Sequence, residues 1–236
     1  MELSKYEIII RTWNIIKEHL PLLVLTVLFM FTLNIIFSVV QDKIMMQTTY
    51  RSIIFISAAF LFQAGLNLGM IRISLNMINQ KNVYFSLLFS SFHMLIPSVL
   101  ASLVYICILF IAALPGLLLL IYSSGGIASI NIFSILSIIL LIAPATYLSV
   151  RFQFYNYFLI DEECEIIESL KKSANISHGH ILELFVIGAM LSIITLISII
   201  PLGLGLLISI PLSTTTLTYI YMILSKKIHI NNRQYK

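Results

Sequence analysis

The sequence predicts an all-α polytopic membrane bundle, a single integral membrane domain over residues 1–236 with six transmembrane helices and three amphipathic interfacial helices. Composition is the first reason: 59% of the residues are hydrophobic and only 10% are charged, whereas a soluble domain carries about a quarter charged residues. The distribution of charge is the second reason. Residues 82–150 and 184–225 contain no Asp, Glu, Lys or Arg, and each run is long enough for two bilayer-crossing helices of about 20 residues.

Two shorter uncharged runs near the N-terminus supply the remaining spans. The Ser-Ser-Gly-Gly sequence at 123–126 and the Pro-Leu-Gly-Leu-Gly sequence at 201–205 predict turns that divide the two long runs. Inside the third span, Pro115 and Gly116 can bend the helix. The six expected spans are 20–40, 52–71, 97–122, 127–150, 181–200 and 206–224.

Amphipathic segments precede the first two pairs of spans. In residues 4–19 polar side chains recur at the 4-3-4 spacing of one helical stripe, which predicts a helix lying in the membrane interface. Residues 83–95 repeat this pattern in a more apolar form and predict a second interfacial helix. The first polar stripe is Glu7, Arg11, Asn14 and Glu18, opposite Ile9, Trp13 and Ile16; the second is Ser86, Ser90 and His93.

The third interfacial helix is expected in a polar connector at 151–180. Asp161 is a good N-cap residue, and the acidic residues after it suit the first turn of a helix. Glu168 and Lys172 have the i,i+4 spacing of a helical ion pair. The expected apolar side of this helix is Ile166, Ile167, Leu170 and Ala174. An amphipathic helix followed by a hairpin would thus occur three times, which suggests a degenerate repeat of about 80 residues.

The positive-inside rule predicts that both termini lie in the cytoplasm. With the N-terminus inside, only Lys43 and Arg51 fall on the opposite side of the membrane. Six apolar spans with few charges suit the cytoplasmic (inner) membrane of a bacterium, with the protein crossing it several times; an organelle membrane is the alternative. The cations assigned to the cytoplasmic side are Lys5, Arg11, Lys17, Arg72, Lys81, Arg151, Lys171, Lys172, Lys226, Lys227, Arg233 and Lys236.

From the second span onward, the order of features resembles a prokaryotic family of uncharacterised membrane proteins. This family includes the YciC-like proteins and the membrane domain fused to some glycerophosphodiester phosphodiesterases. The resemblance covers about two thirds of the chain and implies a six-helix inner-membrane protein, but no biochemical activity. The matching features are the Gly65/Gly69 span ending in Arg72, the FSLLFSSF segment at 85–92, Pro115-Gly116, Arg151 before an aromatic run, the ESLKKS segment at 168–173, Gly179, and Pro211 with Tyr219 and Tyr221.

Arg72, Arg151 and Glu183 are the candidates for binding a ligand or a lipid headgroup. Each is expected at the cytoplasmic end of a span, where an ionisable group is costly unless it is paired or reaches the interface. A salt bridge from Arg72 or Arg151 to Glu183 would tie the hairpins together. Snorkelling of the two arginines to lipid phosphates is the alternative.

Small and polar residues within the spans define two further candidate groups. Gly65 and Gly69 have the spacing that lets helices approach closely, either inside this bundle or in a homodimer. Gln63, Asn67 and Thr214 are the candidates for a solute pathway, provided that they line one cavity. The hydroxyl groups can instead bond to carbonyls of their own helix.

No catalytic residue, metal ligand or cofactor is expected. The acidic residues near 161–165 are accounted for by helix capping, and His178-Gly179-His180 has no recognisable ligand spacing. Cys164 is flanked by carboxylates, which disfavour its thiolate.

The leading expectation for function is a non-enzymatic membrane scaffold or accessory protein. Its expected partners are membrane lipids, chiefly anionic headgroups on the cytoplasmic face, together with a membrane protein or a second copy of the chain; nucleic acid is not expected. A transporter or channel for a lipid-like solute and an enzyme acting on lipid headgroups are the two alternatives.

Overall fold

A computed structural model describes residues 5–45, 49–122, 132–200 and 203–234. The chain is all-α as predicted, and no strand occurs in these ranges. The helices are α1 (Lys5–Glu18), α2 (Leu20–Met45), α3 (Thr49–Ile78), α4 (Leu87–Ser90), the 3-10 helix η1 (Phe92–Met94), α5 (Leu95–Tyr122), α6 (Ile132–Phe152), α7 (Tyr155–Asp161), α8 (Ile166–Ser177), α9 (Ile181–Ile197) and α10 (Leu206–Gln234).

Five of the described helical stretches are long and apolar enough to cross a membrane. They contain α2, α3, α5, α6 and α10. A sixth is reached if α8 and α9, which meet at an angle of 97°, are taken together as one broken span. The chain therefore has the architecture of a multi-pass membrane protein, with the long helices at the predicted positions.

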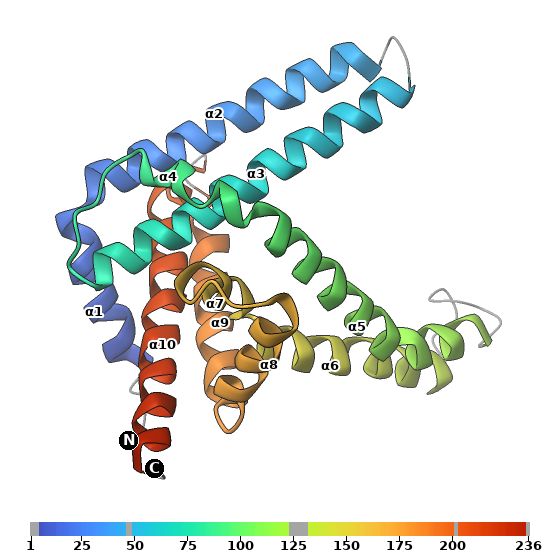
Figure 1. The fold of residues 1–236 in the computed structure, drawn as a ribbon. Helices are drawn as coiled ribbons and strands as arrows, with labels where there is room; N and C mark the ends of the chain where they lie inside the picture. The colour runs from blue at the N-terminus through green and yellow to red at the C-terminus, as the bar shows by residue number, and fades with distance from the viewer. Residues whose placement is uncertain (1–4, 46–48, 123–131, 201–202, 235–236) are drawn as a thin grey trace.

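The long helices pair along the chain as α2 with α3, α5 with α6, and α9 with α10, and the first two pairs spread apart from each other (Figure 1). The α2–α3 hairpin and the α5–α6 hairpin extend to the right as separate arms, whereas α10 runs down the left side beside α1 and α9. The buried share of the helices differs between α10 and the two arms. Half of the most apolar stretch of α10 is buried (50%), but only 6% of the corresponding stretches in the spans containing α5 and α6 are.

The core lies where α3, α7, α9 and α10 meet. Tyr221 and Phe154 are its largest fully buried side chains. The Tyr221 ring stacks on Tyr157 at a centroid distance of 5.6 Å and meets the edge of Phe158 at 5.0 Å. These aromatic contacts bury the short helix α7 among the three longer helices.

The prediction of one continuous helix over residues 83–95 is wrong. The segment forms one α-helical turn, α4, followed by the 3-10 helix η1. Leu87 and Leu88 are buried instead of facing lipid. The backbone of Leu88 lies directly against α3 at Gly69, where a Cβ atom would overlap the Leu88 carbonyl, so packing on α3 replaces regular helix here.

The predicted start of the connector helix is also wrong. Asp161 is the last residue of α7, and α8 begins five residues later with Glu165 at the N-cap position. Glu163 adopts φ 50° and separates the two helices. The reason is tertiary: Tyr157, Phe158, Leu159 and Ile160 are all buried, so the aromatic run forms a helix of its own.

Two helix faces differ from their expected composition. In α8, Ser169 and Ser173 are buried together with Leu170 and Ala174, whereas Ile167 is 51% exposed. In α1 the buried stripe is Ile8, Thr12 and Ile16, and this face packs on α10. Close packing against neighbouring helices favours small serine side chains over larger apolar ones.

Several long helices extend beyond the predicted spans. α2 continues past residue 40, α3 past residue 71 and α10 past residue 224. The predicted turn at 123–126 and the first residues of the span 127–150 lie outside the described residues, as do residues 201 and 202 of the second predicted turn. In the remainder of that turn Gly203 has φ 77°, a conformation that favours glycine.

Candidate functional site at the charged end of the bundle

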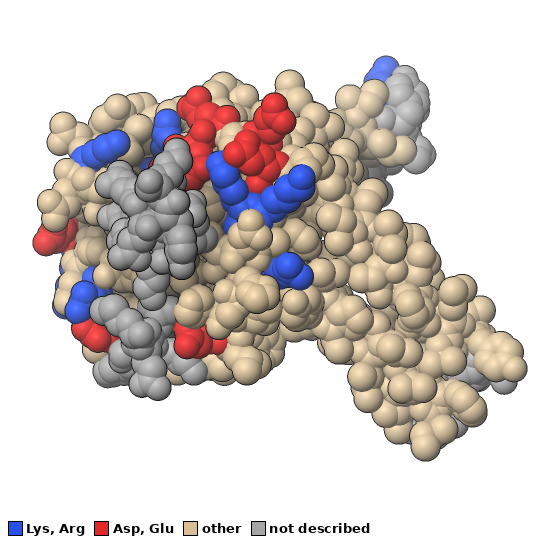
Figure 2. Space-filling view, turned by 60° about the horizontal axis from the view of Figure 1, so that its bottom comes forward, with Lys and Arg blue, Asp and Glu red and all other residues tan. Residues whose placement is uncertain are grey.

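Ionisable side chains gather at one end of the molecule, which we call the base. It consists of α1, α7, α8 and the loops 79–86 and 178–180. Figure 2 shows basic and acidic side chains together on this face, whereas the α5–α6 arm carries no Asp, Glu, Lys or Arg before Arg151 near the end of α6. The base is therefore the part of the surface that can recognise a charged ligand.

Arg72 fixes the end of α7. Its Nη1 donates a hydrogen bond of 2.9 Å to the carbonyl oxygen of Ile160, one of the last carbonyls of that helix. A cation at a helix C-terminus is favourable, because the final carbonyls lack partners within the helix. Next to it, the Tyr221 hydroxyl donates to Asp161 Oδ2 at 2.9 Å. Helices α3 and α10 thus hold α7 from two sides.

Arg151 lies near the end of α6 and interacts mainly with its own helix. Its Nη1 donates to the Tyr147 hydroxyl at 3.3 Å, and its Cζ lies 5.9 Å from the centroid of that ring. Its Nε is buried without a hydrogen-bond partner. The Arg151 carbonyl accepts from Ser173 Oγ at 3.2 Å, and Ser173 Oγ in turn accepts a hydrogen bond from Phe154 N at 3.0 Å. Ser173 therefore caps the end of α6 from α8.

Glu183 forms neither of the expected salt bridges. Its Oε2 lies 3.1 Å from Nδ1 of His180, the N-cap residue of α9. No ion pair joins Glu183 to Arg72 or Arg151 in the described part of the chain. The expectation fails because the Ile160 carbonyl and the Tyr147 ring engage the arginines, while an acidic residue in a first helical turn is stabilised locally.

Lys172 is the centre of a small ionic cluster on α8. Its Nζ lies 2.7 Å from Glu168 Oε1, which confirms the predicted i,i+4 pair, and 2.7 Å from Glu162 Oε2. Hydrogen bonds to Glu162 and Glu168 raise the pKa of Lys172, so the ammonium group is committed to these partners. Burial raises the pKa of the Cys164 thiol, as expected for a poor nucleophile.

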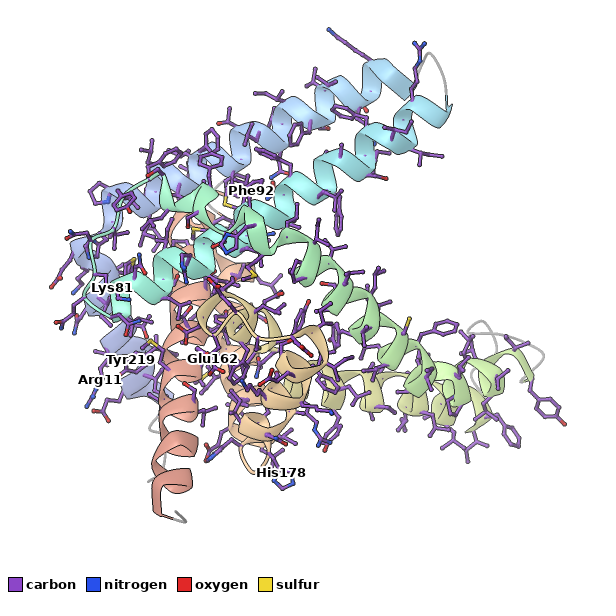
Figure 3. All side chains as sticks on the ribbon, in the orientation of Figure 1. Arg11, Lys81, Phe92, Glu162, His178 and Tyr219 are labelled. Carbon is purple, nitrogen blue, oxygen red and sulfur yellow. The ribbon has the colours of Figure 1, made fainter. Side chains whose placement is uncertain are left out.

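Three lysines of the base lie on its surface; of these, Lys17 Nζ donates to Asn14 Oδ1 at 3.4 Å and lies over the Trp13 ring. Lys17, Lys81 and Lys171 are exposed and form no ion pair within the described residues. Lys81 lines a cavity of about 920 Å³ between the end of α1 and the loop that follows α3, beside Glu18 and His19. Figure 3 shows Lys81 at this corner of the molecule, above Arg11 and Tyr219. The Arg11 guanidinium lies beside the Tyr219 hydroxyl, and this contact and Glu7 raise its pKa.

The remaining candidates from the sequence are spread over α3 and α10. Gly65 faces the Phe92 ring, where a Cβ atom would lie 2.8 Å from Cε1, and Gly69 faces Leu88; both glycines thus admit the α4–η1 segment of the same chain. Asn67 is exposed. Thr214 Oγ1 donates to the carbonyl of Ile210 in its own helix. Gln63 Oε1 is buried without a hydrogen-bond partner.

The described residues contain no group of three or more His, Cys, Asp or Glu side chains arranged to hold a metal ion. His93 Nε2 lies 3.7 Å from Glu163 Oε1, and both side chains are more than half exposed. His178 lies in the turn between α8 and α9, to the right of the lower part of α10 in Figure 3. The base is thus a surface of mixed charge without such a cluster among its described residues.

Sequence reasoning missed α7 and the residues that hold it. The Tyr221–Asp161 hydrogen bond joins side chains 60 residues apart, and no local pattern marks such a pair. The aromatic composition of 152–158 was the available signal, because so many large side chains at the edge of a polar connector indicate burial.

A scan against models of known protein families found no match, and searches of characterised proteins and of solved structures likewise found none. The function is therefore inferred from this chain's own residues.

Proposed function

We propose that the protein is a non-enzymatic scaffold of the bacterial cytoplasmic membrane that binds anionic lipid headgroups at its base and thereby organises lipid or partner proteins around it. The observation that carries this proposal is a set of three exposed lysines that form no ion pair among the described residues: Lys17 on α1, Lys81 in the loop after α3, and Lys171 on α8. Basic residues next to membrane spans attract anionic lipids by about 1 kcal/mol each.

The proposed orientation puts the base in the cytoplasm. It follows from the sequence, in which the cations of 1–40 and 72–236 all fall on one side of a six-span topology. We also retain the relationship to the YciC-like proteins as a proposal. The solution of a YciC-like structure with three hairpins and an α7-like helix bound by arginine would support it, and a different hairpin order would contradict it.

The two alternative functions have less support. Transport through this chain would need Gln63, Asn67 and Thr214 to line one cavity, but Asn67 is exposed and Thr214 bonds to its own helix. A headgroup enzyme would need convergent catalytic groups, whereas Glu162 and Glu168 of the base already pair with Lys172.

Lipid selectivity tests the proposal. The protein is extracted into nanodiscs containing equal amounts of phosphatidylglycerol and phosphatidylethanolamine, and the lipids bound to it are identified by native mass spectrometry. The wild type is expected to enrich phosphatidylglycerol. Each Lys→Gln substitution at Lys17, Lys81 or Lys171 is expected to lower that enrichment by roughly five-fold at low salt, the equivalent of ~1 kcal/mol.

The matched control is Lys43→Gln, which removes a lysine at the far end of α2. Equal effects of Lys43→Gln and the base substitutions would contradict the proposal, as would a wild type without selectivity. If a protein co-purifies with the wild type and is lost from the triple Lys→Gln variant, the base recruits that partner directly.

A further inference from the structure

A second cavity opens between α9, α10 and the turn that joins α6 to α7. Its volume is about 510 Å³, within the range of small-molecule sites. Polar and small residues on its wall include Gln153, Gly188, Ser192, Thr195 and Ser213. From Gly188 to Leu196 the lining extends over nine residues of α9, a length of about 12 Å. We call this cavity the α9 groove.

Two donors in the α9 groove lack acceptors. Gln153 Nε2 and Ser213 Oγ are buried without a hydrogen-bond partner. In contrast, the hydroxyl groups of Ser192 and Thr195 bond to the carbonyls of Gly188 and Leu191 at 2.9 and 2.8 Å. An unsatisfied amide donor in apolar surroundings is costly, so the groove is built for an occupant that brings an acceptor oxygen.

Gly188 keeps the groove open. A Cβ atom at Gly188 would meet nothing within 4 Å, whereas at Gly65, Gly69 or Gly116 it would meet neighbouring atoms at 2.8 Å or less. Close helix packing therefore does not explain this glycine. A glycine inside a helix costs about 1 kcal/mol relative to alanine. At this position the missing side chain leaves empty space in the groove, which Gln153 also lines.

The chemistry of the lining selects the occupant. Among the residues that the structure describes, no Asp, Glu, Lys, Arg or His lines the groove, so the missing acceptor is a neutral oxygen and not a phosphate. Leu196 in the wall is 64% exposed and the neighbouring Ile193 is 55% exposed; in a bilayer these apolar side chains face lipid. An occupant can therefore enter from the hydrocarbon region.

We propose that the α9 groove holds one acyl chain of a membrane phospholipid, with the ester carbonyl accepting a hydrogen bond from Gln153 Nε2. This inference deepens the proposed scaffold function and rests on it, because it adds an internal lipid to the lipids recruited at the base. Ser213 lies in the same cavity and offers a second donor to the glycerol-ester region.

The first experiment fills the groove. The protein is purified in mild detergent after several exchange steps, and the phospholipid that remains bound is counted by native mass spectrometry. The wild type is expected to keep one phospholipid per chain. Gly188→Leu projects a side chain into open space and is expected to lower the retained lipid about ten-fold while the protein stays folded, because space in the cavity is its only loss.

The control is Ile193→Phe, which adds apolar bulk to α9 outside the groove lining and is expected to retain the lipid. A wild type that keeps no lipid would overturn the proposal. So would a Gly188→Leu variant that keeps as much lipid as Ile193→Phe.

A second variant tests the hydrogen bond. Gln153→Leu is expected to lower lipid retention about five-fold, the usual effect of losing one hydrogen bond, and to unfold at the same or a higher temperature once lipid is stripped, because the unpaired amide is gone. Unchanged retention together with a lower unfolding temperature would show that Gln153 acts only in folding and would overturn the assigned hydrogen bond.

The two lipid proposals fail separately. The Lys→Gln variants of the base are expected to change the ratio of phosphatidylglycerol to phosphatidylethanolamine without loss of the retained lipid. Gly188→Leu is expected to remove the retained lipid without changing that ratio. Loss of one effect alone contradicts only the proposal to which it belongs.

Discussion

At the scale of single residues, the glycines of this chain have opposite roles. Gly69 lies where α3 meets the backbone of Leu88, and a backbone carbonyl cannot rotate away as a side chain can. Gly65 faces only the Phe92 ring, which can move. Gly188 faces open space. The same substitution should therefore have a different sign or size at each of the three positions.

Alanine substitutions of these glycines should fall in a fixed order of stability. Gly69→Ala is expected to destabilise the protein by about 1–3 kcal/mol, because overpacking moves α4 away from α3. Gly65→Ala should cost less, and Gly188→Ala should stabilise α9 by up to about 1 kcal/mol through helix propensity. Thermal unfolding in lipid-stripped detergent measures all three. A Gly69→Ala variant as stable as Gly188→Ala would show that the α3–α4 contact is not close.

Gln80 is a second residue at which one substitution is informative. It ends α3 with φ 55°, while Lys81 N donates to Asn76 O and Gln80 N donates to Met77 O. This is the helix-ending pattern in which glycine is usual. Gln80→Gly is expected to stabilise the protein by about 0.5–1 kcal/mol. Asn79→Gly is the control, since its φ is not positive, and it should not stabilise; equal effects would contradict the argument.

At the scale of elements, α7 is the helix that depends most on its neighbours. Its seven residues are too few for a stable isolated helix. It persists because Arg72 binds its C-terminal carbonyl, Tyr221 binds Asp161, and aromatic rings enclose it. The hydrogen bonds from α3 and α10 therefore act on one element.

Removing either hydrogen bond should loosen α7. Arg72→Ala and Tyr221→Phe are each expected to cost about 1.5–3 kcal/mol, as for hydrogen bonds with a charged partner, and the double variant should deviate from additivity because both bonds hold one helix. Cleavage by a Glu-specific protease in the exposed segment 162–165 reports the opening. Lys81→Ala is the control and should leave cleavage unchanged; strictly additive single effects would show that α7 is not one cooperative unit.

Structural elements that depend on local sequence could be predicted, whereas elements that depend on tertiary packing could not. Long apolar runs predicted the long helices because a span must satisfy all its backbone groups within one helix. The Glu168–Lys172 pair was predictable because it is local. The helix α7, the interrupted segment at 83–95 and the serine face of α8 depend on what packs against them. The α9 groove was not predictable either, since a glycine that packs and a glycine beside a cavity look alike in a sequence.

At the scale of the whole molecule, the separation of charge from apolar surface predicts one orientation. In a background with Cys107 and Cys164 replaced by alanine, Lys43→Cys and Lys171→Cys place one thiol at each end of the molecule. A membrane-impermeant thiol reagent should label Lys43→Cys in intact cells and Lys171→Cys only in inverted vesicles, because twelve of fourteen Lys and Arg residues fall on the predicted cytoplasmic side. The reverse pattern would mean that the base faces outward.

Little of the α5–α6 arm is buried inside the molecule, and this should decide which substitutions the arm tolerates. A position whose side chain meets only lipid tails is constrained by hydropathy, and not by shape. Exchanges among Leu, Ile, Val and Phe along this arm should therefore be nearly neutral in a saturation mutagenesis screen, whereas charged residues should be lost. Gly116 is the expected exception, because α6 backbone atoms lie 2.5 Å from where its Cβ would be. The amino-acid sequence of the arm should therefore change faster during evolution than that of α10. Sequence similarity between relatives of this protein should persist longest in the helices around α7.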